Sequence, residues 1–119
     1  MLPQSPSFPL AVALGILACV HPARASSPAD EENLRFFENK IRPLLVKHCY
    51  SCHSSQSKPL EGGLRLDSRP GWKQGGDSGV AIVPGAPEKS RLMRAVEYTD
   101  EDLAMPPEGV LDKSEIQLF

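Results

Sequence analysis

The 119-residue chain has few cysteines, few aromatic side chains and no long hydrophobic run. Of its three cysteines, Cys19 lies in the apolar N-terminal stretch, which leaves Cys49 and Cys52 as the only pair further along the chain. No apolar run reaches the roughly 18 residues that indicate a transmembrane helix. Basic residues are not in excess, so no feature of the composition indicates nucleic-acid binding.

The N-terminus resembles a secretory signal peptide. An apolar run over residues 10–20 is too short to span a bilayer, and Ala23-Arg24-Ala25 follows it as an A-x-A-like cleavage site. We therefore expect residues 1–25 to be removed and the rest to be periplasmic or secreted. An alternative is a lipoprotein signal in which Cys19 becomes the lipidated first residue, since residues 16–19 loosely resemble a lipobox.

Removal of this segment leaves residues 26–119, which are enough for one small domain with a limited core. This part carries 12 basic and 15 acidic side chains, a net charge of −3. No transmembrane segment is expected after the leader.

The most informative stretch is Cys49-Tyr50-Ser51-Cys52-His53, a C-x-x-C-H pattern. Two thiols at this spacing can add to the two vinyl groups on one edge of a haem, which ties the ring to the backbone. The imidazole of the next residue is then carried under the iron as the proximal axial ligand. The pattern predicts one covalent haem c, with Cys49 and Cys52 as attachment points and His53 as a metal ligand.

Three other uses of a C-x-x-C pair are known. A thioredoxin-like dithiol belongs in a βαβ context, and no such pattern surrounds the motif. A structural zinc ion needs four ligands, and no second pair of Cys or His residues follows the first. A disulfide between Cys49 and Cys52 would close a very small loop and add little stability. Covalent haem leaves no free thiol for nucleophilic catalysis, and we expect no catalytic residue.

The segment before the motif has helical periodicity. Acidic residues 30–32 favour a helix N-terminus, and Pro43 predicts a kink or two short helices. The residues expected on the inward face recur at steps of three and four: Leu34, Phe37, Ile41, Leu44, Leu45 and His48.

After the motif the sequence is rich in Ser, Gly and Pro and predicts irregular backbone rather than a sheet. A helix is expected over about residues 87–98, with Leu92 and Val96 facing inward.

Met105-Pro106-Pro107 is the second informative feature. A six-coordinate electron-transfer haem needs a distal ligand, and a thioether sulfur raises its potential. Pro106 restricts Met105 to extended angles, which suits a ligand presented from a loop. Met93 is an alternative ligand, although its expected helical position favours core packing. His48 is too close to Cys49 to reach the distal face easily.

Residues 112–115 have the form of a capping box, with Asp112 as N-cap and Glu115 at the third helical position. A helix is therefore expected to begin there. Because the sequence stops at Phe119, we expect this helix, and the domain with it, to be incomplete at the C-terminus.

Taken in order, the motifs of residues 36–119 resemble the planctomycete-type cytochrome c domain, which is similar to class I cytochromes c. The resemblance implies an all-α haem-binding domain with long irregular loops, Cys49 and Cys52 as attachment points, and His53 and Met105 as iron ligands. It also implies that the chain is the N-terminal fragment of a larger secreted protein. The residues that carry it are Phe37, Ile41 to Leu45, Cys49 to His53, Gly62 to Asp67, Gly75 to Gly79, Val83 to Gly85, Ser90, Leu92 and Met105 to Pro107.

The function expected from these features is one-electron transfer through haem c, with no catalysis by this chain. The expected partner is a redox protein or domains appended at the C-terminus. Two alternatives stay open: a haem-based regulatory or ligand-binding module of a secreted multidomain protein, and a haem-free secreted dithiol protein.

Overall fold

A computed structural model describes residues 27–119, so the expected signal peptide and Cys19 lie outside the described residues. Within this range the chain is helical and forms no strand, which confirms the all-α prediction. None of the described helices is both long and apolar enough to cross a membrane. The elements are α1 (Pro28–Phe36), η1 (Phe37–Ile41), α2 (Arg42–His48), η2 (Glu61–Gly63), α3 (Arg69–Gln74), η3 (Pro87–Lys89), α4 (Arg91–Val96) and α5 (Lys113–Ile116).

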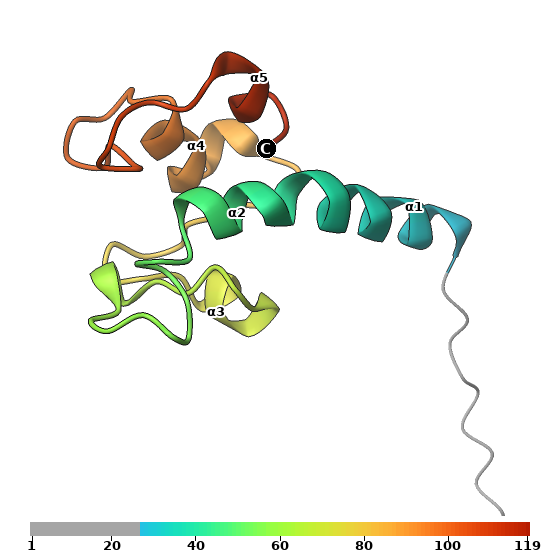
Figure 1. Cartoon of the computed structure of the whole chain (residues 1–119), viewed down its shortest axis with the longest axis horizontal. Helices are drawn as coiled ribbons and strands as arrows, with labels where there is room; N and C mark the ends of the chain where they lie inside the picture. The colour runs from blue at the N-terminus through green and yellow to red at the C-terminus, as the bar shows by residue number, and fades with distance from the viewer. Residues whose placement is uncertain (1–26) are drawn as a thin grey trace, which may run out of the picture.

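The first three elements form one continuous rod that ends at the C-x-x-C-H motif (Figure 1). Ser27 caps α1 by accepting a hydrogen bond from the amide of Asp30 at 3.1 Å, and the Asp30 carboxylate accepts from the Ser27 amide. In the middle, η1 is a π-helical turn in which the amide of Arg42 bonds to the carbonyl of Phe37.

Pro43 explains the π-helical turn. Its ring has no N–H and would collide with the carbonyl four residues earlier, whereas a locally wider helix relieves that contact. Pro43 then lies in the first turn of α2, as one of the two predicted arrangements requires.

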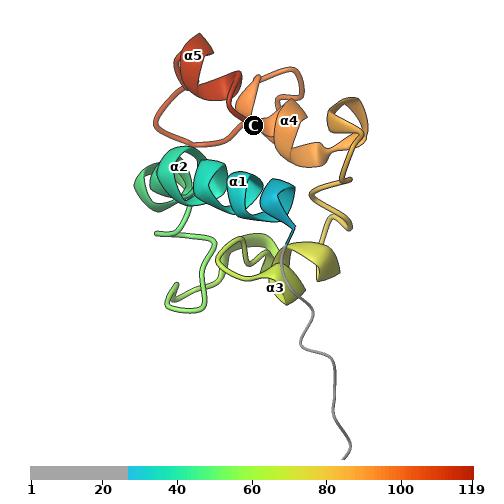
Figure 2. The ribbon, with the colours of Figure 1, turned by 90° about the vertical axis from the view of Figure 1, so that its right-hand side faces the viewer.

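The remaining elements lie on two sides of this rod (Figures 1 and 2). In both views α4 and α5 lie on one side of α2, and α3 with the loops that follow the motif lies on the other. The loop between α4 and α5, which contains Met105, therefore lies on the other side of the rod from the loops that follow the motif.

The hydrophobic core is small and lies around the C-terminal half of the rod. Its buried apolar residues are Leu45, Leu66, Ala81, Ala95, Val96 and Leu111. Val96 is the most deeply buried, at 2% exposure. Buried apolar residues thus come from α2, from α4 and from the loops on both sides of the rod.

The predicted inward face of the first helix is wrong over its N-terminal turns. Leu45 is buried, and Ile41, Leu44 and His48 are half-buried, but Leu34 and Phe37 are 60% and 38% exposed. The reason is geometric, because α1 extends past the other helices (Figure 1) and no described element covers it.

Two further sequence expectations need correction. The region after the motif is not wholly irregular, because α3 forms over Arg69–Gln74, with Ser68 accepting a hydrogen bond from the amide of Gly71 at 3.2 Å. The helix expected over residues 87–98 is divided into η3 and α4 by extended backbone at Ser90. The buried Ser90 hydroxyl accepts from the amide of Val83 at 2.9 Å, which stabilises the break.

The predicted capping box at the start of α5 is present. Glu115 accepts a hydrogen bond from the amide of Asp112 at 3.4 Å. The other oxygen of the same carboxylate lies 3.1 Å from Lys47 Nζ and 3.4 Å from His48 Nε2, so the first turn of α5 is also tied to the last turn of α2.

Candidate haem site

The C-x-x-C-H motif begins where α2 ends. The amide of Cys49 still bonds to the carbonyl of Leu45, at 2.9 Å. The Cys49 carbonyl then accepts from the amides of Cys52 and His53, at 3.1 and 2.8 Å. This single tight turn brings the two thiols and the imidazole together on one short piece of backbone, directly after a rigid helix.

The His53 ring is oriented by a backbone carbonyl. Its Nδ1 lies 3.3 Å from the carbonyl oxygen of Leu64. A carbonyl can only accept a hydrogen bond, so this contact requires the proton on Nδ1 and leaves the lone pair of Nε2 free. Histidines that bind metals nearly always have such a second contact, which fixes both tautomer and ring orientation. In the neutral imidazole, the Nε2 atom of His53 therefore has a lone pair with which it could bind a metal ion.

The loop that supplies this carbonyl is closed by two hydrogen bonds between its first and last residues. The amide of Leu66 donates to the carbonyl of His53 at 2.9 Å. One residue further on, the Asp67 carboxylate accepts from the amide of Ser55 at 2.7 Å. This hydrogen bond is the main reason that the pKa of Asp67 is lowered. Residues 53–67 thus form a closed loop that holds the Leu64 carbonyl against His53.

Glycines let a second loop pack closely on this one. Gly62 has a φ of +56°, a left-handed conformation that favours glycine. Its carbonyl accepts from the amide of Asp77 at 2.7 Å. A Cβ added to Gly76 would lie 2.3 Å from that carbonyl oxygen, so the contact requires glycine there. The Gly-rich stretch after α3 therefore supports the loop that orients His53.

Both motif cysteines are free thiols, and both are half-buried. Burial, followed by the neighbouring Cys52, raises the pKa of Cys49 to about 11. A thiol with such a pKa is almost wholly protonated at neutral pH, while thiol catalysts need a lowered pKa. Cys49 is therefore a weak nucleophile at neutral pH. Two unbridged thiols at this spacing are what covalent attachment of a haem requires.

Met105 lies on a loop beyond α4, as the sequence predicts, and the residue is 41% exposed. Its amide donates to the carbonyl of Ala95 at 3.1 Å. The carbonyl of the next residue, Pro106, accepts a hydrogen bond from the hydroxyl of Tyr98. Met105 is thus held by its backbone, and its thioether side chain remains accessible.

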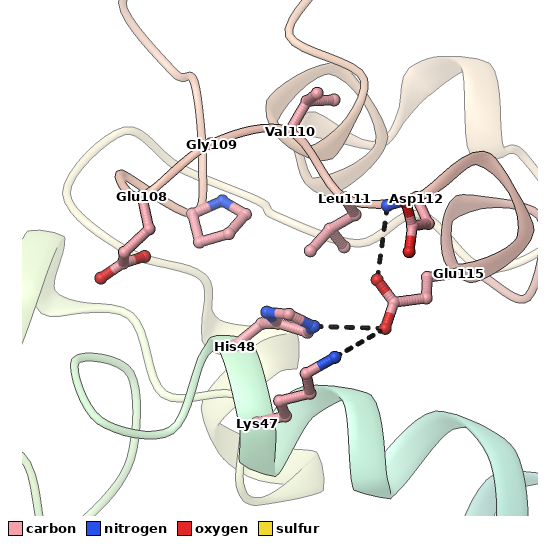
Figure 3. A pocket seen from close by; sticks show the side chains of 9 residues that line it. Lys47, His48, Glu108, Gly109, Val110, Leu111, Asp112 and Glu115 are labelled. Carbon is pink, nitrogen blue, oxygen red and sulfur yellow. Dashed lines mark hydrogen bonds and ion pairs between the residues drawn. The ribbon is translucent and has the colours of Figure 1, made fainter.

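The alternative distal ligands are engaged elsewhere. Met93 lies in α4 and is half-buried, where it lines a cavity of about 330 Å³ together with Ile82, Leu92 and Phe119. His48 points toward Glu115 across a second cavity of about 240 Å³ between α2 and residues 106–115 (Figure 3). Cys49, Cys52, His53 and Met105 line neither cavity.

Sequence reasoning missed three contributors to the site: the Leu64 carbonyl, the Asp67 carboxylate and the Tyr98 hydroxyl. A backbone carbonyl leaves no trace in residue type, so the Leu64 contact could not be read from the sequence. The position of Asp67 could have indicated its role, because an aspartate after a short apolar segment often bonds to a nearby backbone amide. The position of Tyr98 indicated its role less strongly, since the residue only stands where a helix is expected to end.

Comparison with known proteins identifies the family of the chain. No curated protein and no solved structure matches it. The family model described as planctomycete cytochrome C matches residues 49–109, which begin at the first cysteine of the motif and extend past Met105-Pro106-Pro107. The match covers more than half of the sequence, and cytochrome c families bind haem c. The chain is therefore a member of the planctomycete cytochrome c family.

Proposed function

We propose that this chain transfers single electrons through one haem c, attached by thioethers to Cys49 and Cys52 and ligated by His53 and Met105. The observation that carries the proposal is the His53 contact with the Leu64 carbonyl, which leaves Nε2 free immediately after two unbridged thiols. A structural or catalytic dithiol would not need an oriented imidazole at this position.

In this proposal, haem attachment and iron ligation are assigned to different residues of the chain. When bound, the haem supplies the one-electron couple of its iron. Cys49 and Cys52 would hold the ring on the end of α2, and His53 would present Nε2 in the orientation that Leu64 fixes. Met105 would present its sulfur from the other side, which favours the ferrous form and raises the potential. No general acid, base or nucleophile is required, and we propose no catalysis by this chain.

The proposal extends to compartment and partner. Haem c is attached outside the cytoplasm in bacteria, so an exported chain, in the periplasm or secreted, is consistent with the motif. The partner we propose is a redox protein or further domains of the same polypeptide, which would exchange electrons at an accessible edge of the ring.

The decisive experiment compares two methionine variants of the full chain, expressed with cytochrome c maturation. We expect the unaltered protein to have a sulfur-to-iron charge-transfer band in the near infrared and to bind carbon monoxide slowly when reduced. Met105→Ala should abolish the band, lower the potential and allow rapid binding. Met93→Leu is the matched control and should change neither property. An unchanged spectrum in Met105→Ala would refute its role as the ligand.

A second candidate function is a haem-based regulatory module in which Met105 leaves the iron and a diatomic ligand enters. The partial exposure of Met105 favours it, because a ligand on an accessible loop can move away more easily. Rapid carbon monoxide binding by the unaltered reduced protein at neutral pH would support this candidate over permanent electron-transfer ligation.

A further inference from the structure

Helix α4 ends in a turn that normally contains glycine. The amide of Tyr98 donates to the carbonyl of Ala95 at 3.2 Å, and the amide of Thr99 donates to the carbonyl of Arg94 at 3.1 Å. These two hydrogen bonds define a Schellman turn, whose first residue beyond the helix cap takes a left-handed conformation. Glycine usually occupies that position because it has no Cβ. Here the residue is a tyrosine.

The tyrosine is a conformational outlier. Tyr98 has a φ of +56° and is the one residue other than glycine with positive φ in the described part of the chain. For a bulky side chain this conformation is strained, and such strain persists where surrounding contacts require it. A glycine would form the same turn without strain, so the contacts of the tyrosine side chain must explain why a tyrosine occupies this position.

The Tyr98 side chain contacts the loop that carries Met105. The half-buried Tyr98 hydroxyl donates to the carbonyl of Pro106, directly after Met105. On the other side of Met105, its own amide donates to the carbonyl of Ala95. Two contacts from the same helix end therefore hold the backbone immediately before and after the Met105 side chain.

The intervening segment is closed by short-range contacts. Arg94 pairs with Asp100 at 3.6 Å, and the amide of Leu103 donates to the carbonyl of Asp100 at 3.1 Å. These contacts shape residues 99–104 but do not reach beyond Met105. Beyond the methionine, the Pro106 carbonyl also accepts from the amide of Gly109 at 3.2 Å, but of these two contacts it is the Tyr98 hydroxyl that ties the carbonyl to the end of α4.

We infer that Tyr98 is a positioning residue for Met105: its hydroxyl, held by the strained end of α4, keeps the Met105 sulfur presented as the distal ligand. This inference rests on the proposed function. Tyr98 acts through the Pro106 carbonyl and the loop backbone and has no direct role at the iron. Weakening this contact increases the fraction of molecules in which Met105 is off the iron.

Two substitutions separate positioning from simple structural support. Tyr98→Phe keeps the ring and the backbone strain but removes the hydroxyl. Tyr98→Gly removes the hydroxyl and relieves the strain, so it should make the turn itself more favourable. Thr99→Val is the matched control, because the Thr99 hydroxyl bonds the Arg94 carbonyl at 3.3 Å in the same turn without contacting Pro106. Met105→Ala provides the reference for complete loss of the ligand.

The experiment uses the full chain with haem attached and follows carbon monoxide binding and the sulfur-to-iron band. We expect Tyr98→Phe to raise the carbon monoxide association rate about tenfold, since one net hydrogen bond changes an opening equilibrium by roughly that factor. Tyr98→Gly should show an equal or larger rise together with an unchanged or higher Tm. Thr99→Val should leave the association rate as in the unaltered protein.

The outcomes distinguish this inference from the proposed function. If Met105→Ala loses the band and Tyr98→Phe and Tyr98→Gly bind carbon monoxide like the unaltered protein, the positioning role is overturned while Met105 ligation stands. If the unaltered protein already lacks the band and behaves like Met105→Ala, the proposed ligation fails, and the inference fails with it. A higher Tm combined with weaker ligation in Tyr98→Gly would be the strongest support, because a purely structural tyrosine could not produce it.

Discussion

The two segments that carry the predicted axial ligands are held in different ways. The proximal loop, residues 49–67, is fastened to itself: His53 contacts Leu64 through its ring and Leu66 through its carbonyl, and Asp67 closes the loop onto Ser55. The distal loop, residues 98–106, has local contacts of its own, but Met105 and Pro106 are tied through their backbone to the end of α4. Its predicted ligand, Met105, is 41% exposed, whereas His53 is half-buried.

This contrast suggests a division of roles. The proximal loop is built from contacts within about 20 residues of sequence, so it can form as one local unit once α2 has formed. The distal loop depends on α4 and on one strained residue. Changes in the proximal loop should therefore affect whether haem is retained, and changes in the distal loop should affect only how its iron is ligated.

The largest effect is expected from removing the attachment points. Cys49→Ala combined with Cys52→Ala leaves no thiol for a thioether, so no haem should remain with the chain after denaturing gel electrophoresis and peroxidase staining. Ser51→Ala lies between them and should stain like the unaltered chain. Retention of stain by the double variant would show that attachment occurs elsewhere.

A second large effect is the pH dependence of Cys49 in the chain produced without haem. Its pKa, raised to about 11 by burial, predicts very slow alkylation by iodoacetamide at pH 7, with about a tenfold rise per pH unit as thiolate forms. Peptide mapping of the labelled protein would follow this residue separately from Cys52. A rate that levels off near pH 9 would contradict the buried environment.

An intermediate effect is expected at the closure of the proximal loop. Asp67→Ala removes the acceptor of the Ser55 amide and should cost about 1 kcal/mol, or a fall in Tm of about 4–8 °C for a domain of this size. Because the pKa of Asp67 is lowered in the folded state, this stabilisation is present above the ordinary carboxyl pKa. It should disappear as the pH falls below about 4 and through the lowered value.

Thermal unfolding followed by circular dichroism at neutral and acidic pH measures the Asp67 effect. Asp77→Ala removes an exposed carboxylate from the neighbouring loop and serves as the matched control. An equal loss of stability in the two variants, or a difference that persists at low pH, would count against the loop closure.

The smallest effect is expected where α5 meets α2. The pKa of Glu115 is lowered chiefly by its hydrogen bond with Lys47, but the pair is at the surface, where such contacts contribute little. Glu115→Gln should lower the Tm slightly, and about 1 M salt should remove the difference. Glu108→Gln, in the same cavity, is the control, and haem content should stay constant in both variants.

The sequence allowed prediction of the features that depend on local patterns. The helix before the motif, its interruption at Pro43 and the capping box of α5 all follow from short-range rules, and the structure confirms them. Of the two arrangements that Pro43 allowed, the structure has two helices with Pro43 in the first turn of the second. The all-α class follows from the same rules, because no segment has the alternation that a stable sheet needs.

The features that could not be predicted depend on tertiary geometry. Leu34 and Phe37 have helical spacing, but their burial depends on whether another element covers α1. The Leu64 carbonyl meets His53 only because two loops pack together at Gly62 and Gly76. The left-handed Tyr98 runs against local preference, so sequence rules favour a different residue at that position.

The central claim is that this chain carries one covalent haem c at Cys49 and Cys52, and intact-mass spectrometry tests it most directly. The full chain, expressed with cytochrome c maturation and denatured, should be heavier by the mass of one haem, with the added mass on the peptide that contains residues 49–53. A mass equal to that of the polypeptide alone, with Cys49 and Cys52 free or joined in a disulfide, would contradict the account.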